Sequence, residues 1–192
     1  MNILSDKLPT NVLIDGVEVQ VNTDFRISIA FELLADEDVS EIEKLEKALE
    51  LYYPVIPGNL NAAVERILWF YKCGKEQKRG KKSSKVLYRF DCDDDYIYSA
   101  FLTQYGVDLQ EVEYLHWWKF RSMFQGLKED NEIVKIIGYR AMDISGKMSK
   151  EQKRFYQEMK ERYKLPISQK KKEKLDRVEE ALLNGGDLSG IL

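Results

Sequence analysis

Few residues of this chain could carry metal or nucleophilic chemistry: there is one histidine, His116, and there are two cysteines, Cys73 and Cys92. Structural zinc sites need four cysteine or histidine ligands, and helical metalloprotease motifs need two histidines. The two cysteines form no CxxC pair, and a basic segment separates them. We therefore expect no zinc site and interpret both cysteines as reduced thiols of a cytoplasmic protein.

A run of acids, Asp91 and Asp93 to Asp95, is the best candidate for a metal site. A calcium loop needs alternating oxygen ligands, a glycine and a bidentate glutamate about twelve residues from its start. Here Tyr96 and Ile97 follow at once and begin an apolar helical face. Because carboxylates are favourable at the positive N-terminal end of a helix, we expect this run to begin a helix rather than to bind a metal.

Motifs for phosphate binding and acyl transfer are missing from the sequence. It contains no GxxxxGK[ST] loop, no GxGxxG after a strand and no GxSxG elbow. We therefore expect neither enzymatic activity nor a cofactor. Two basic segments, Lys72 to Lys85 and Lys147 to Arg177, could instead bind nucleic acid. The alternative is a solvated linker and a solvated helical face, which the isoelectric point near 5.5 favours.

The stretch EYLHWWKFRSMFQGL, Glu113 to Leu127, is predicted to be an aromatic helix that packs in the core. We expect His116 to lie at the edge of its apolar face, without a catalytic partner. Helical spacing places four side chains on that face, and two more widen it: Trp117, Phe120, Phe124 and Leu127, then Leu115 and Trp118.

The other segments predict a mainly α protein, a helical bundle with a small N-terminal β-hairpin packed on it. Asp15-Gly16 can form a tight turn between the alternating flanks of Asn11 to Val21. An isolated hairpin is marginal in water, so this one must pack on helices. Periodicity and capping residues predict helices within the ranges 22–36, 40–53, 59–73, 90–106, 113–127, 130–145, 149–164 and 168–186.

Composition and charge divide the chain into four parts. We expect a hairpin with helices over 1–73, a basic flexible linker over 74–90, an aromatic-rich helical core over 91–146 and basic charged helices over 147–192. Residues 147–177 hold twelve Lys or Arg and five Asp or Glu, a net charge of +7 against −3 for the whole chain. No apolar run approaches the roughly 20 residues that span a bilayer, and the start lacks the features of a signal peptide. We expect no membrane association.

Three segments together, DDDYIYSAFLTQYGVDL, LHWWKFRSMFQGL and IIGYRAMDI, resemble the ordered core motifs of the phage gp-fifteen family, found in tailed phages and prophages of Gram-positive bacteria. The resemblance covers about Asn11 to Lys164 and is densest from Asp91 to Ile144. The residues that carry it, most of which we also expect in the core, are Tyr98, Phe101, Leu115, His116, Trp117, Trp118, Phe120, Phe124, Tyr139 and Arg140.

The resemblance implies a non-enzymatic tail assembly chaperone of a siphophage. Such a protein coats the tape measure protein in the host bacterial cytoplasm, helps to recruit major tail protein and leaves before the virion is complete. Further copies of the chain are another candidate partner. A structural tail or connector component and a nucleic-acid-binding accessory protein are the alternatives. We expect partners to contact the thin apolar face of the C-terminal helices, through Phe155, Tyr156, Met159 and Tyr163.

Overall fold

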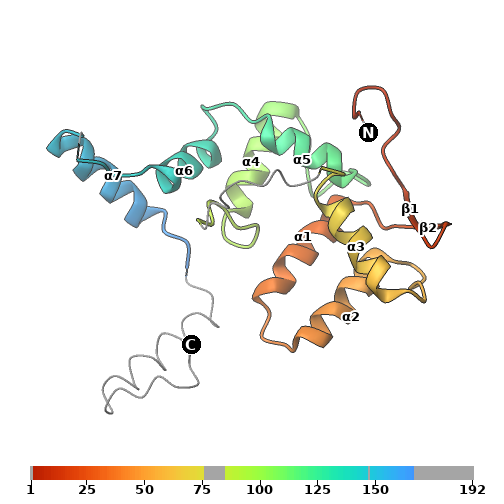
Figure 1. The fold of residues 1–192 in the computed structure, drawn as a ribbon. Coiled ribbons are helices and arrows are strands. Elements are labelled where there is room, and N and C mark those ends of the chain that lie inside the picture. Colours follow the sequence, from red (N-terminus) through yellow and green to blue (C-terminus); the bar gives the residue numbers. More distant parts are fainter. Residues whose placement is uncertain (1, 76–84, 147, 167–192) are drawn as a thin grey trace, which may run out of the picture.

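The computed structural model describes residues 2–75, 85–146 and 148–166. In these ranges the chain forms an antiparallel hairpin, seven α-helices and one short 3-10 helix (Figure 1). The expected fold class, mainly α with a small N-terminal β-hairpin, is confirmed. The elements are β1 (Asn11–Ile14), β2 (Val17–Gln20), α1 (Phe25–Leu33), η1 (Leu34–Asp36), α2 (Glu41–Tyr52), α3 (Leu60–Tyr71), α4 (Asp94–Tyr105), α5 (Trp117–Gln125), α6 (Glu132–Ala141) and α7 (Lys150–Arg162).

The hairpin turns at Asp15 and Gly16, whose φ angles of 50° and 79° are those of a tight two-residue turn. Val12 and Ile14 are buried. The amide of Asn59 donates to both oxygens of the Asp15 carboxylate, at 3.1 and 3.0 Å. The turn is therefore fastened to the start of α3, which supplies the helical support that the hairpin needs.

The core is centred on Phe120 of α5, which has no exposed surface. Its ring stacks on Phe25 of α1 and on Phe101 of α4, each with 4.9 Å between centroids. Trp117 and Phe124 continue the stack along α5. Each buried aromatic ring contributes on the order of 2 kcal/mol through burial alone, so α5, although short, holds α1 and α4 together.

Helices α6 and α7 lie at one end of the molecule, away from α1, α2 and α3 (Figure 1). Ser149 and Gln152 form a reciprocal capping box that begins α7. Met159 is buried, and α7 packs on α6, which in turn packs on α4. We call this helix pair, residues 132–162, the arm.

The predicted helix over 113–127 is shorter than expected. It begins at Trp117, because His116 forms an isolated antiparallel bridge with Asp24 and has extended backbone. It ends at Gln125, with Gly126 as its C-cap. Of the expected linker over 74–90, residues 76–84 lie outside the described ranges, whereas Tyr88 and Phe90 pack against Phe124. The helix predicted over 168–186 also lies outside them.

Candidate functional site

The paired tryptophans join α5 to the end of α3. The indole N–H of Trp117 donates to the carbonyl of Tyr71 at 2.9 Å, and that of Trp118 donates to the carbonyl of Phe70 at 2.8 Å. Carbonyls in the last turn of a helix have no partner within the helix. The two indoles therefore bury their rings and also satisfy the C-terminal carbonyls of a second helix.

His116 is buried, with 3% of its surface exposed, so the expected position at the edge of the apolar face is wrong. Its Nδ1 accepts the backbone N–H of Trp118 at 3.0 Å and so caps α5. A neutral ring whose Nδ1 accepts carries its proton on Nε2, which donates to the carbonyl of Pro9 at 3.1 Å. Burial lowers the pKa of His116 below its ordinary value, so its role is to join the N-terminal segment to α5 as a neutral ring.

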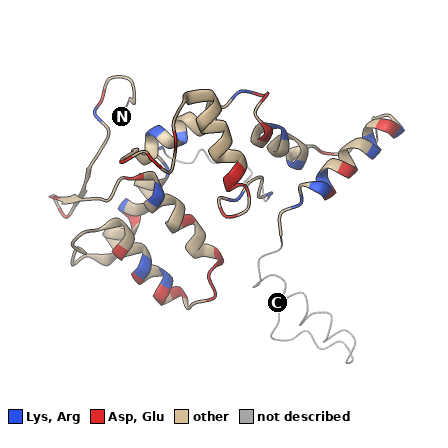
Figure 2. Ribbon diagram, turned by 180° about the vertical axis from the view of Figure 1, so that it is seen from behind, with Lys and Arg blue, Asp and Glu red and all other residues tan. Residues whose placement is uncertain are grey.

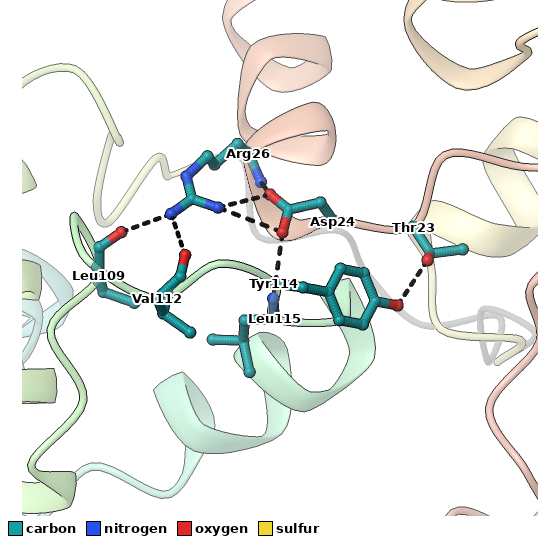
Figure 3. A network of polar contacts seen from close by, with 7 residues as sticks. All are labelled: Thr23, Asp24, Arg26, Leu109, Val112, Tyr114 and Leu115. Carbon is teal, nitrogen blue, oxygen red and sulfur yellow. Dashed lines mark hydrogen bonds and ion pairs between the residues drawn. The ribbon is translucent and has the colours of Figure 1, made fainter.

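The segment before α5 is fastened to α1 by a polar network (Figure 3). The carboxylate of Asp24 caps α1 by accepting from the backbone of Arg26, and it also accepts from the backbone of Leu115. The Arg26 guanidinium donates to two carbonyls of the loop, those of Leu109 and Val112, at 3.0 and 2.7 Å. Our sequence reasoning missed this network, although an aspartate directly before a helix is a capping signal.

Arg140 holds the arm to the body through the carboxylate of Asp93. Two of its nitrogens donate to Asp93 at 2.7 and 2.9 Å, and its Nε donates to the carbonyl of Tyr163 at 2.6 Å. It also donates to the carbonyl of Leu87. Asp93 lies directly before α4, but its side chain does not cap the helix as expected. One guanidinium thus connects α4, α6, the end of α7 and the segment that leads into α4.

The four residues predicted to contact partners lie in different environments on the arm. Met159 is buried. Tyr163 stacks on Tyr139 at 5.9 Å and donates to Glu132. Tyr156 is half-buried and touches Phe155, which is 46% exposed and also meets the edge of Tyr139. The free aromatic surface of the arm is therefore made by Phe155, with the half-buried rings of Tyr139 and Tyr156 beside it.

The remaining residues that carry the family resemblance lie mainly in the core. Phe101, Leu115 and Phe124 are buried, whereas Tyr98 is half-buried and lines a cleft between α4 and the loop that holds Leu109. A hydrogen bond to Asp108 raises the pKa of Tyr98. The residues expected in the core are thus brought together around α5, and Arg140 and Tyr139 belong to the arm.

Within the described ranges, no group of three or more His, Cys, Asp or Glu is placed to hold a metal ion. In the same ranges no helix is long and apolar enough to cross a bilayer. Other exposed apolar side chains are spread over the N-terminal segment, the hairpin, α2, the α2–α3 connection, α3 and α4, among them Leu4, Leu13, Val17, Ile42, Val55, Leu68 and Leu102.

A family model described as bacteriophage Gp15 protein matches residues 4–165 of the chain. The match spans the hairpin, the core around α5 and the whole arm. No curated protein and no solved structure matched.

Proposed function

Because the chain belongs to the bacteriophage Gp15 protein family, we propose that this phage protein is a tail assembly chaperone that binds the tape measure protein of its own phage. It would hold apolar stretches of that protein in the bacterial cytoplasm while the tail tube grows, and leave before the virion is complete. The major tail protein and further copies of the chain are additional candidate partners.

The observation that carries the proposal is the aromatic surface of the arm. Phe155 exposes 46% of its surface although it lies on α7, a helix that begins with a capping box and packs on α6. Exposed apolar side chains that gather in one patch mark interaction surfaces, and grooves lined by such side chains receive amphipathic helices. The rings of Tyr139 and Tyr156 contact Phe155 and widen this surface, while they also take part in the packing of α6 against α7.

Residues of both charge signs alternate along the helices of the arm (Figure 2). On α7 the acids Glu151, Glu158 and Glu161 alternate with the basic residues. Dense mixed charge keeps a protein with exposed apolar residues in solution, which a holding protein requires. The same alternation weakens the nucleic-acid alternative, because a phosphate backbone is bound by a surface of one sign.

Co-expression tests the proposal most directly. The untagged chain is produced together with a tagged tape measure protein encoded by the same phage. We expect the tape measure protein to become soluble and to carry the chain through affinity purification. If the tape measure protein stays insoluble and nothing co-purifies, the proposal is wrong.

Mass spectrometry of purified particles separates the chaperone from the structural alternative. A chaperone is absent from the virion, whereas a tail or connector component is present in a fixed ratio to the major tail protein. Binding to nucleic acid would appear as an affinity that falls steeply with salt concentration.

A further inference from the structure

An apolar groove lies between α1 and α2. Its floor is aliphatic, its volume is about 470 Å³, and two acids and one lysine stand at its rim. The lysine, Lys47, is paired with Glu37 at 2.6 Å, which leaves Glu50 as the free charge of the rim. The floor is made by Ala30, Leu33, Leu34 and Leu51.

A row of carboxylates runs along α2 beside this groove. Glu43, Glu46 and Glu50 are exposed and recur at i, i+3 and i+7, which places them on one side of the helix. Glu46 and Glu50 form no ion pair with any residue of the described ranges. The turn from α1 to α2 adds further acids, as the red segment there shows (Figure 2). The groove therefore favours a ligand that is apolar on one side and cationic on the other.

The end of the described chain lies next to this groove. A second cleft, of about 580 Å³, is lined by Glu32, Leu33, Ala35 and Asp36 of α1 and η1 and also by Leu165 and Pro166. Leu33 lines both the second cleft and the groove. The 26 residues that follow Pro166, residues 167–192, thus start within reach of the groove, because the step from Pro166 to residue 168 can span about 7 Å.

The sequence of this C-terminal segment matches the groove in charge and in apolar pattern. At helical spacing Lys170, Lys174 and Arg177 form one row. A helix rises 1.5 Å per residue, so this row and the row from Glu43 to Glu50 are both about 10 Å long. The apolar side chains that lie beside the basic row are Leu175, Val178 and Leu182.

We propose that residues 168–183 bind as an amphipathic helix in the groove between α1 and α2 of the same chain, with Lys170, Lys174 and Arg177 facing Glu43, Glu46 and Glu50. The segment acts as an intramolecular cover for the apolar surface of this groove. This inference does not depend on the proposed chaperone function, because it concerns the chain alone.

Carbodiimide cross-linking of the full chain tests this placement, because the reagent joins only carboxylates and amines in direct contact. We expect amide links between Glu43, Glu46 or Glu50 and Lys170 or Lys174 in the monomer band, and the monomer and dimer bands are both read by mass spectrometry. A mixture of ¹⁴N- and ¹⁵N-labelled chains distinguishes links within one chain from links between two. Links that occur only between differently labelled chains would mean that a second copy fills the groove, and the proposal would be overturned.

Charge reversal provides the second test and does not require truncation. We expect the triple variant Lys170→Glu, Lys174→Glu and Arg177→Glu to increase hydrogen exchange of the α2 amides at least several-fold. Adding Glu43→Lys, Glu46→Lys and Glu50→Lys to the same chain should restore protection. Reversal of Lys150 and Arg154, which are exposed on α7, is the matched control and should leave α2 unchanged. Equal exchange in all variants, with no cross-link to α2, would refute the placement.

Discussion

The carboxylate of Asp93 and the guanidinium of Arg140 form a buried bidentate ion pair across 47 residues of sequence. Their side chains are 1% and 10% exposed. Asp93 also accepts the backbone N–H of Arg89, so the pair fixes the entry to α4 as well as the arm. Removing only one partner of such a pair is strongly destabilising, because the charge of the other partner stays buried without compensation.

Replacing Asp93 with Asn should therefore lower the free energy of unfolding by about 3 to 5 kcal/mol, since it leaves the Arg140 charge without its partner. Urea denaturation followed by circular dichroism measures the change. Glu161→Gln is the matched control: its partner Lys164 is exposed, and we expect a change below about 0.5 kcal/mol. Similar losses in both variants would show that the buried pair stabilises the protein no more than an exposed ion pair does.

The stability of the chain should depend on pH through its only histidine. Burial lowers the pKa of His116 below 6.5, so the unfolded chain takes up the proton first as the pH falls. The contribution of neutral His116 to the free energy of unfolding should therefore be complete above about pH 7. Below pH 6.5 the free energy of unfolding should decrease, by at most about 1.4 kcal/mol per pH unit. Urea denaturation at several pH values measures the slope.

The matched variant for this measurement is His116→Asn, which keeps a side-chain acceptor for the N-cap but cannot titrate. Between pH 7.5 and 5.5 its curve should be flatter than that of the unchanged chain. Parallel curves would assign the pH dependence to carboxylates instead.

Gly74 should not tolerate a side chain. It has a φ of 66°, and a Cβ there would lie 2.9 Å from Cη2 of Trp118 and 3.3 Å from Cζ2 of Trp69. We expect Gly74→Ala to destabilise the protein by about 1 to 3 kcal/mol, through the left-handed backbone and the displaced indoles. Gly58→Ala meets nothing within 4 Å and should change the thermal midpoint by no more than a degree or two.

The two sides of α7 should respond differently to substitution. Phe155→Ser should reduce recovery of the tape measure protein in the co-expression assay while leaving unfolding nearly unchanged. Met159→Ser should cost about 2 kcal/mol or more, because it removes a buried side chain. Leu102→Ser is the control, since Leu102 on α4 is 44% exposed, close to the 46% of Phe155. Equal loss of recovery in Phe155→Ser and Leu102→Ser would place the contact elsewhere.

The elements could be predicted because their signals are local. Asp15-Gly16 predicted the hairpin, capping residues predicted where helices begin, and the spacing of Trp117, Phe120 and Phe124 predicted the central helix. All three depend on neighbours within a few residues. The fold class followed from the sum of such signals.

The side-chain partners could not be predicted in the same way. Asp93 is typical of a helix start, and nothing near it in the sequence indicates that its carboxylate pairs with Arg140. His116 was expected at an edge because helical periodicity continues through Leu115, whereas the bridge between His116 and Asp24 makes the helix begin only at Trp117. Such pairings depend on which segments meet in space, and single-residue patterns carry no information about that.

The hydrogen bonds from Trp117 and Trp118 to the end of α3 also mean that the N-terminal half can complete its packing only after the ribosome has synthesised α5. Residues up to Cys73 contain α1, α2 and α3, yet Phe25 stacks on Phe120 of α5, and Phe70 packs against Trp118 of α5 as well as against Tyr52 of α2. At 5–20 residues per second, the ribosome needs roughly 2 to 9 s to proceed from Cys73 to Trp118. During that interval the nascent N-terminal half exposes its incomplete core to solvent, and the packing of the two tryptophans ends this exposure.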